Sequence, residues 1–436
     1  MVGWFDPRLL AMTAWQAVGA QTFGTYLDKR EIEVLLDKEG SEIRSSSAAD
    51  AVWLDYVADL GDGFDPTYAI AWHLAKPQLD IADGDQQLRL PRGEYLVMGG
   101  DEVYPAPTRH RYLNQTVGPY SAAFPPLAGA GSSPQLLALP GNHDWYDGLS
   151  LFIEQFCTAK AIGGWELPQA RSYFAVALPE NWWLWAVDAG LGGHIDLPQT
   201  KYFEDLEVGH GARIILCWAK PTWAKLRSKP GEHDLLTRFV RQCIPEHATV
   251  PLYLSGDSHH FAHYRSRDED VHWVTAGGGG AFLHPTHHLD RYVDLPDDSG
   301  GITHLELVDD DPWPSKRTSR WLLLRLAAFP RYNPSFLLFT AALHLVLAWA
   351  IQFGLRGDDE SFASSLKGLR IGDVFWGGFV RNPVSLLLGL LVIVGFYAFA
   401  KPPRQGEERL QDLRGHPRRF PRRPGPVPDP VPVAVA

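Results

Sequence analysis

The sequence predicts a layered α/β domain followed by two membrane-spanning helices. Five apolar runs of strand length occur between residues 52 and 254, and each leads into a turn that contains glycine, aspartate or proline. Continuous apolar runs are typical of strands that are covered on both faces of their sheet. Two longer apolar stretches, at about 335–355 and 382–400, approach the ~20 residues that a helix needs to cross a bilayer.

The overall composition restricts the class of protein. At 436 residues, the chain has room for one large domain or about two to three average ones. The formal net charge of −11 argues against a nucleic-acid binder. The three cysteines are widely spaced, so they predict neither a disulfide framework nor a thiolate metal cluster, and they fit a reducing compartment. The sixteen tryptophans indicate a large aromatic core, an interfacial belt, or both.

Residues 1–50 predict an N-terminal helical segment rather than a signal peptide. The first thirty residues carry early charges and lack a clean apolar block. Asp6 followed by Pro7 indicates a helix start, because the carboxylate can cap and proline suits the first helical position. We expect this helix to pack against the domain, with a position on a membrane surface as the alternative. Residues 32–50 predict a helix end and a loop.

Residues 51–314 contain the predicted α/β domain. Its strands are expected at 52–58, 95–98, 135–139, 213–218 and 251–254. The segments 149–160 and 233–243 are long enough for helices or extra strands. In layered α/β folds, functional groups gather where strands end. The glycine-rich turn 277–280 could bring backbone close to such a site, or it could simply be a tight connection.

Residues 315–400 predict a membrane region with both ends of the chain in the cytoplasm. Lysine and arginine gather before the first apolar stretch and after the second, whereas the connecting loop is balanced by acidic residues. The positive-inside rule then places the large domain on the cytoplasmic side of a multi-pass protein. His344 within the first span could be functional or could be tolerated as a neutral residue. The basic, proline-rich tail 401–436 predicts disorder and could contact anionic lipid or remain solvated.

Side chains that can bind metals follow four of the apolar runs. The candidate ligands and proton donors are Asp59, Asp101, Asn142, His143, Asp144, Asp257 and His259, with Asp62 and His263 as further candidates. Oxygen and imidazole ligands suit Mn, Fe or Zn, and the surplus of carboxylates suits two divalent ions held close together. Two such ions can polarise a phosphoryl group and activate a water, while an adjacent imidazole protonates the leaving oxygen.

Other polar residues near these runs have simpler interpretations. Asp55 lies on the same strand as Asp59 and is expected to be structural. Asp62 is either a ligand or a turn-forming residue. Three further histidines are expected at the surface or in loops: His110, His194 and His210.

The strand-end motifs resemble those of the calcineurin-like metallophosphoesterase family. The matching segments appear in the family's order over roughly residues 50–290: Asp59, Gly100-Asp101, Gly141-Asn142-His143-Asp144 and Gly256-Asp257-Ser258-His259. The segment 188–199 also looks like the strand and turn before the family's fourth motif. The resemblance implies a four-layer β-sandwich flanked by helices, and a two-metal site.

The resemblance also implies a role for each matching residue. Asp101 would bridge the two metals. Asp59 and His259 would hold one ion, and Asn142 and Asp257 would hold the other. His143 would act as the general acid, oriented by Asp144.

Three positions depart from the family's pattern. Gly61 stands where the first motif has histidine, although Asp62 or water could replace that ligand. Ala219 stands where the fourth motif has a metal-binding histidine, and Asp257 replaces the first histidine of the last motif. These changes could shift the metal preference toward harder ions such as Mn or Mg, or could leave only one metal well bound.

The sequence therefore predicts a membrane-anchored, metal-dependent phosphoesterase that hydrolyses a phosphate mono- or diester. Its expected partners are a phosphoester substrate and the membrane, and Lys220 could lie near the phosphate. The alternative is a catalytically weakened regulatory membrane protein that binds metal or phosphate. Gly61 and Ala219 favour that alternative, whereas the retained Asn142-His143-Asp144 favours the enzyme. A structural scaffold for partner proteins is a third hypothesis.

Overall fold

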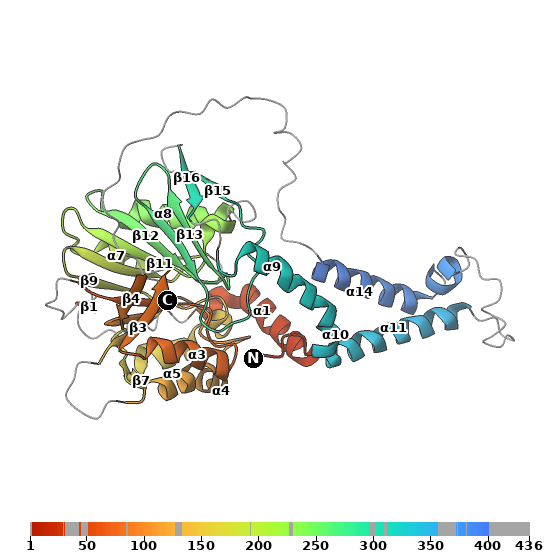
Figure 1. The fold of residues 1–436 in the computed structure, drawn as a ribbon. Helices are drawn as coiled ribbons and strands as arrows, with labels where there is room; N and C mark the ends of the chain where they lie inside the picture. Colours follow the sequence, from red (N-terminus) through yellow and green to blue (C-terminus); the bar gives the residue numbers. More distant parts are fainter. Residues whose placement is uncertain are drawn as a thin grey trace. The chain divides into compact units, whose positions relative to one another are not determined.

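A computed structural model of the protein describes residues 2–28, 30, 43–44, 51–83, 86–126, 133–191, 193–225, 230–296, 301–308, 312–355, 372, 374–380 and 382–400 (Figure 1). Of these, residues 2–4 and 11–324 form one compact unit, and residues 5–10 and 325–400 form a second. The predicted tail 401–436 lies outside the described residues, as do most of residues 32–50 and the loop between the predicted spans.

A five-stranded sheet in the first unit carries three of the predicted strands. Its order is β2 (Leu54–Val57), β5 (Tyr95–Met98), β6 (Gln135–Ala138), β8 (Trp165–Glu166) and β7 (Ala161–Ile162). The strands β2, β5 and β6 are parallel neighbours, with Val57 opposite Met98 and Met98 opposite Ala138. Because the three strands end at the same level, the residues that follow them meet at one edge of the sheet.

A nine-stranded sheet carries the other two predicted strands. Its order is β1 (Ile43–Arg44), β9 (Phe174–Leu178), β10 (Trp182–Val187), β11 (Arg213–Trp218), β12 (Thr249–Ser255), β14 (His272–Ala276), β13 (Phe261–Ser266), β16 (Ile302–Leu307) and β15 (Tyr292–Pro296). The central strands β10, β11, β12 and β14 are parallel. A separate hairpin, β3 (Gln78–Asp83) with β4 (Gln86–Pro91), was not predicted from the sequence.

The two sheets share one apolar core, and helices cover their other faces. Buried residues of both sheets form a common cluster that includes Val97 and Leu137 from one sheet and Leu184 and Leu254 from the other. A second cluster joins the nine-stranded sheet to helices α7 (Leu197–Glu204) and α8 (Pro230–Cys243). A third joins the five-stranded sheet to α3 (Phe64–Leu74), α5 (Gly118–Ala123) and α6 (Ser150–Phe152). Figure 1 shows α3 and α5 on the opposite side of this unit from α7 and α8.

The mixed α/β class is confirmed, and each of the five predicted strands overlaps an observed strand. The segment 149–160 contains α6 and the π-helical turn Ile153–Thr158, and the segment 233–243 lies within α8. The N-terminal helix α1 (Pro7–Leu27) begins where it was predicted, because Asp6 Oδ1 accepts the main-chain N–H groups of Arg8 and Leu9 at 2.9 and 3.2 Å. The helix α4 (Arg109–Tyr112) and the π-helical turn Leu113–Val117 precede α5.

The C-terminal part of the described chain is helical. It contains α9 (Lys316–Leu322), a 3-10 segment at Leu323–Ala328, α10 (Phe329–Tyr332), α11 (Pro334–Leu355), a π-helical segment at Val374–Val380, and α14 (Pro383–Ala400). Within the described residues, one helix is long and apolar enough to cross a membrane, over the 20 residues Pro334–Phe353. The apolar stretch of α14, Pro383–Tyr397, is shorter. The first predicted span thus meets the requirement, which supports membrane association, and the second is helical but shorter than a full span.

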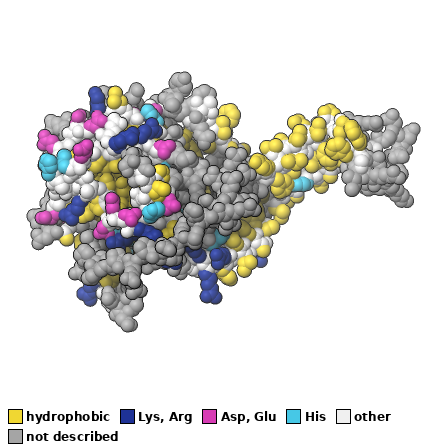
Figure 2. Space-filling model, turned by 90° about the horizontal axis from the view of Figure 1, so that it is seen from above, with side chains coloured by type: hydrophobic (Ala, Val, Ile, Leu, Met, Phe, Trp, Pro, Cys, Tyr) yellow, Lys and Arg dark blue, Asp and Glu magenta, His cyan; other side chains and the backbone are white. Residues whose placement is uncertain are grey.

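The helices α11 and α14 pack together through polar and aromatic contacts. Asn382 donates a hydrogen bond to the Ala350 carbonyl at 2.8 Å, and the rings of His344 and Phe396 lie 6.0 Å apart. The Nδ1–H group of His344 donates to the Thr340 carbonyl one turn earlier at 2.7 Å. His344 therefore has a partner within its own helix. Figure 2 shows hydrophobic side chains over the surface of this helical part.

Candidate metal centre

Three aspartates that follow strands adopt the same unusual backbone conformation. Asp59, Asp101 and Asp257 have φ angles of 59°, 57° and 59°, in the left-handed region that few residues other than glycine enter. Residues held there cost on the order of 1–3 kcal/mol, and such strain gathers at functional sites. The loops are joined directly, because Asp257 N–H donates to Asp59 Oδ1 at 2.9 Å and Asp59 N–H donates to the Gly100 carbonyl at 2.9 Å.

Two of these aspartates converge with a histidine. Ligand atoms of Asp59, Asp101 and His259 lie within 4.8 Å of one another, and all three residues are buried. Asp59 and Asp101 follow strands of the five-stranded sheet, whereas His259 follows β12 of the nine-stranded sheet. His259 Nδ1 lies 2.7 Å from the Phe282 carbonyl and therefore carries the hydrogen, which leaves Nε2 to bind a cation. Three of the predicted ligands thus meet at one point.

A tyrosine that was not predicted from the sequence lies within this cluster. The Tyr104 hydroxyl lies 3.0 Å from Asp101 Oδ2, 3.0 Å from His259 Nε2 and 3.4 Å from Asp59 Oδ1. These are hydrogen-bond distances, and they place the phenol oxygen next to all three candidate ligand atoms. Burial, and then the charge of Asp101, raise the Tyr104 pKa well above its usual value. One O–H group can donate to only one of these three atoms at a time.

The position of the missing first-motif histidine cannot hold a side chain. A Cβ atom on Gly61 would lie 2.1 Å from the Glu102 carbonyl oxygen, and Gly61 has a φ of +76°. The nearby Asp62 has other partners at one oxygen, because its Oδ1 accepts the Trp4 indole N–H at 2.8 Å and the Val2 N–H at 3.2 Å. The role of Asp62 as a metal ligand stays a prediction, since these hydrogen bonds occupy one of its two oxygens. Tyr104 supplies an oxygen beside the cluster.

The glycine-rich turn at 277–280 does approach the site. A Cβ atom on Gly277 would lie 2.2 Å from Asp59 Oδ2. The main chain therefore passes so close to the Asp59 carboxylate that only glycine fits there. Of the two interpretations of this turn, the structure supports the one that brings backbone to the site.

The second set of predicted ligands is less complete. Asn142 Nδ2 donates to the Tyr146 hydroxyl at 3.4 Å, and Asp257 does not belong to the buried group of acidic and histidine ligand atoms found among the described residues. Ala219 lies where the fourth-motif histidine was expected. Its methyl group would be 3.4 Å from a Cβ atom on Gly100, so this loop reaches the site without a ligand. Asn142, Ala219 and Lys220 line one small pocket of about 40 Å³.

His143 is held beside the cluster by its main chain and its ring. Its N–H group donates to Asp101 Oδ1 at 3.0 Å. Its Nδ1 lies 2.7 Å from the Pro105 carbonyl and carries the hydrogen, so Nε2 is the nitrogen that can exchange a proton. The side chain is partly exposed. The contact predicted between Asp144 and this ring is made by Pro105 instead.

Asp144 holds the motif loop rather than the His143 ring. Its Oδ2 accepts the Gly141 and Glu102 N–H groups at 2.9 and 3.2 Å, and its Oδ1 accepts the Tyr112 hydroxyl at 2.6 Å. Burial raises the pKa of Asp144 to about 6. Burial, and then the neighbouring Asp144, raise the pKa of Glu102 well above its usual value. Burial therefore shifts both carboxyl groups toward their protonated forms.

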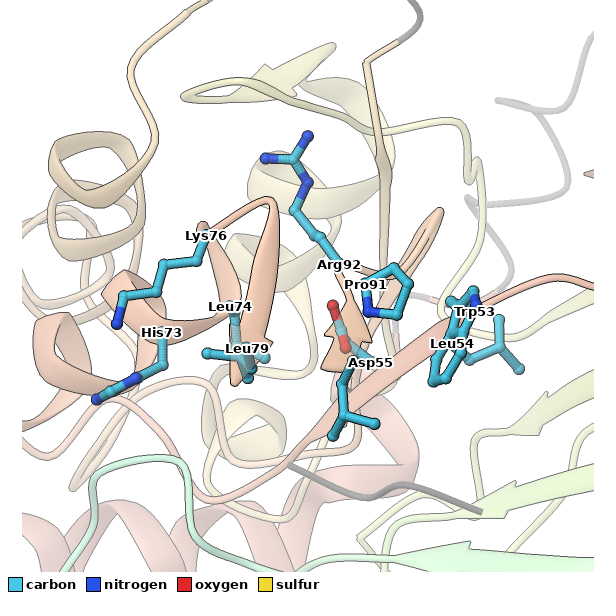
Figure 3. Close-up of a pocket in the computed structure, with 10 residues that line it drawn as sticks. Trp53, Leu54, Asp55, His73, Leu74, Lys76, Leu79, Pro91 and Arg92 are labelled. Atoms are coloured by element: carbon cyan, nitrogen blue, oxygen red, sulfur yellow. The ribbon is translucent and has the colours of Figure 1, made fainter. Parts of the chain in front are cut away.

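The remaining candidates lie elsewhere. His263 Nε2 is 2.8 Å from His272 Nδ1 on the neighbouring strand, and His263 is not part of the buried ligand group. Asp55 Oδ2 accepts the Gly93 N–H at 2.8 Å beside a cavity of about 20 Å³, roughly the space of one water (Figure 3). Asp55 is therefore structural, as predicted. Three histidines are exposed, also as predicted: His110, His194 and His210.

Comparisons with known proteins give little further information. No protein-family model matches the chain, and no curated protein sequence matches it. Among solved structures, the chain is similar to GAP50, the anchor in the inner membrane complex of Plasmodium, with 13% sequence identity and a TM-score of 0.39. The match covers 59% of this chain and 84% of that chain. A likeness of this extent carries no argument about function, so the function must be inferred from the site itself.

Proposed function

We propose that the protein is a metal-dependent phosphoesterase. The observation that carries this proposal is the buried meeting point of Asp59, Asp101 and His259 with the Tyr104 hydroxyl among them. Buried carboxylates that face one another are costly unless a cation lies between them. The partly exposed His143 beside this cluster provides a proton donor for a leaving group.

The residues present fit one divalent ion better than two. Asp59, Asp101, His259 and Tyr104 would hold it, and this set of oxygen and imidazole donors suits Mn, Fe or Zn. A second ion would have Asn142 and Asp257, but Ala219 offers a methyl group where a further ligand was expected. When bound, a divalent ion would supply Lewis acidity toward a phosphoryl oxygen and would activate a water.

The chain's own residues perform the remaining chemical tasks in this proposal. His143 Nε2 gives its proton to the alcohol oxygen as the P–O bond breaks. Asp101 positions His143 by accepting its main-chain N–H, so the proton donor and the metal cluster share one carboxylate. Lys220 lines the pocket beside Asn142, where its charge offsets that of the phosphate.

Fold and location are part of the same proposal. Two sheets with a shared core and helices on their outer faces support a four-layer sandwich of the metallophosphoesterase type. The apolar helix Pro334–Phe353 supports a membrane anchor, and α14 would be the second span. The lysine and arginine residues that flank this region favour a domain that faces the cytoplasm. A reporter fused after residue 436 tests this orientation, and a signal from the other side of the membrane would refute it.

A regulatory protein that binds metal or phosphate is the second candidate. The methyl group of Ala219 and the closed position at Gly61 favour it, because both remove a ligand that catalysis by two metals would use. Metal content together with hydrolysis of a generic aryl phosphate separates the two candidates. The enzyme should contain metal and turn over, whereas a regulator should contain metal and show no turnover.

A matched pair of variants tests the assignment of the site. Asp59→Asn should abolish metal binding and hydrolysis, because it removes a charged ligand. Asp55→Asn is the matched control. Among the described contacts, the Asp55 carboxylate accepts a hydrogen bond only from the Gly93 main chain, so this variant should keep both metal binding and hydrolysis. Equal losses in the two variants would show that the buried cluster has no special role.

A further inference from the structure

The segment Val2–Trp4 is fixed to the domain by a buried carboxylate. The Trp4 indole N–H donates to Asp62 Oδ1 at 2.8 Å, and the Val2 N–H donates to the main-chain oxygen of Asp62 at 2.7 Å and lies 3.2 Å from Oδ1. Asp62 has no exposed surface. A buried carboxylate is costly unless it is hydrogen-bonded, so these contacts bind the segment at a defined position.

Trp4 packs edge-on against three rings of the candidate site. Its ring centroid lies 5.6 Å from that of Tyr104, 6.0 Å from that of His143 and 5.4 Å from that of Phe282, with interplanar angles of 69°, 81° and 70°. Phe282 is 37% exposed, and Trp4 and His143 are partly exposed. Uncharged aromatic surface therefore remains open to a ligand beside the proton donor.

The ring of His143 also contacts two tyrosines. The centroids of Tyr104 and Tyr146 lie 4.5 and 5.1 Å from it. An alcohol that takes a proton from His143 would leave from a position surrounded by aromatic rings. Aromatic surfaces bind apolar and aromatic groups well, whereas they offer no charge to a second phosphate or a carboxylate.

We propose that Trp4 and Phe282 form a binding subsite for the leaving group, which selects phosphate esters of apolar or aromatic alcohols. This inference rests on the proposed function, because it assigns the phosphate to the metal cluster and the alcohol to the aromatic rings. The residue Trp4 then acts as a specificity determinant, and Asp62 positions it.

Binding of two non-hydrolysable phosphonates tests this subsite without any turnover. The full chain in detergent with Mn²⁺ is titrated by calorimetry with benzylphosphonate and with methylphosphonate. An aromatic contact predicts that the wild type binds benzylphosphonate roughly tenfold more tightly. Trp4→Ala should reduce this preference to about twofold or less, and methylphosphonate affinity should change little. Trp15→Ala, on an 81% exposed tryptophan of α1, is the control and should retain the preference.

Two further variants separate recognition from folding. Trp4→Phe keeps an aromatic ring and should retain most of the preference, whereas Asp62→Asn weakens the anchor and should lower it with the indole still present. Thermal unfolding of each variant shows whether the fold is intact. A wild type without preference for benzylphosphonate, or a folded Trp4→Ala variant that keeps the preference, would overturn the subsite. A wild type that shows the preference but never hydrolyses an aryl phosphate would refute the proposed function and leave the subsite standing.

Discussion

The candidate site has two halves that differ in how completely they are built. In one half, Asp59, Asp101, His259 and Tyr104 are buried and their ligand atoms face one another. In the other half, Asn142 and Asp257 are partly exposed, and Ala219 presents a methyl group. The difference indicates that a loop after a strand can reach the site without carrying a ligand, as the loop at Ala219 does. A site of this kind is expected to depend strongly on the first half and weakly on the second.

The largest expected effect separates the two halves directly. Asp101→Asn should remove the metal and lower hydrolysis of an aryl phosphate by about a thousandfold, because several kcal/mol of charge stabilisation are lost. Asp257→Asn should lower it by less than about tenfold, since a partly exposed ligand contributes less. Metal content and kcat/KM of both variants are the measurements. Similar losses in the two variants would mean that both halves bind metal.

The proton donor is expected to have the next largest effect. His143→Gln should leave the metal content unchanged and lower kcat by about a hundredfold for an alkyl phosphate. A p-nitrophenyl ester should lose much less, because its leaving group departs without a proton. Comparison of the two substrates in the wild type and the variant measures this difference. Equal losses for both esters would contradict the role of His143 as general acid.

Tyr104 should affect metal affinity rather than the chemical step. Tyr104→Phe removes one oxygen from the first half, and metal affinity in a competition titration should fall roughly tenfold. Tyr112→Phe is a matched control, because this buried tyrosine donates to Asp144 rather than to the cluster. The control should lower stability without changing metal affinity. If Tyr104→Phe binds metal more tightly, the phenol competes with the ion rather than binding it.

Restoration of a ligand to the second half tests the comparison in the other direction. Ala219 lines the pocket that Asn142 also lines, so a histidine at this position would lie beside the second set of predicted ligands. Ala219→His should raise the metal content per chain above that of the wild type, whereas Ala219→Leu should not. Metal analysis of the purified proteins gives the ratio. An unchanged ratio in Ala219→His would show that the second half lacks more than one ligand.

The smallest expected effect is on the pH dependence of stability. Because the folded-state pKa of Asp144 is raised to about 6, the folded protein binds protons that the unfolded chain has released. The free energy of unfolding of the metal-free protein should therefore fall as the pH rises from about 4 to above 6, by an amount on the order of 3 kcal/mol. Asp144→Asn should flatten this slope, and Asp80→Asn at an exposed site should not. A slope of the opposite sign would contradict the buried carboxyl pair.

The strand ends were predictable because their signal is local. Each of the five apolar runs became a strand, and Asp59, Asp101 and His259 met because parallel strands end at one edge of their sheets. The helix start at Asp6 was predictable for the same reason, since a capping carboxylate and a following proline are neighbours in the sequence.

The rest of the site depends on contacts between distant residues. Nothing local in the sequence shows that Gly61 lies against the Glu102 carbonyl, and the position of the Tyr104 hydroxyl beside the cluster was not predicted. The only sequence feature that pointed to Tyr104 was its place three residues after Asp101. The hydrogen-bond partners of Asp62 and Asp144 were not predicted either, because Trp4 and Tyr112 lie 58 and 32 residues away from them in the sequence.

The candidate ligands come from two different sheets, so an ion bound to them would connect the sheets. Asp59 and Asp101 belong to one sheet and His259 to the other, so a bound ion would join the halves of the domain as a clamp does. An ion at a thousand times its dissociation constant adds about 4 kcal/mol to the stability of the folded state. The melting temperature would then rank metals by affinity, even before any substrate is known. Chelation should increase amide hydrogen exchange first along β2, β5 and β12, the strands that lead into the cluster.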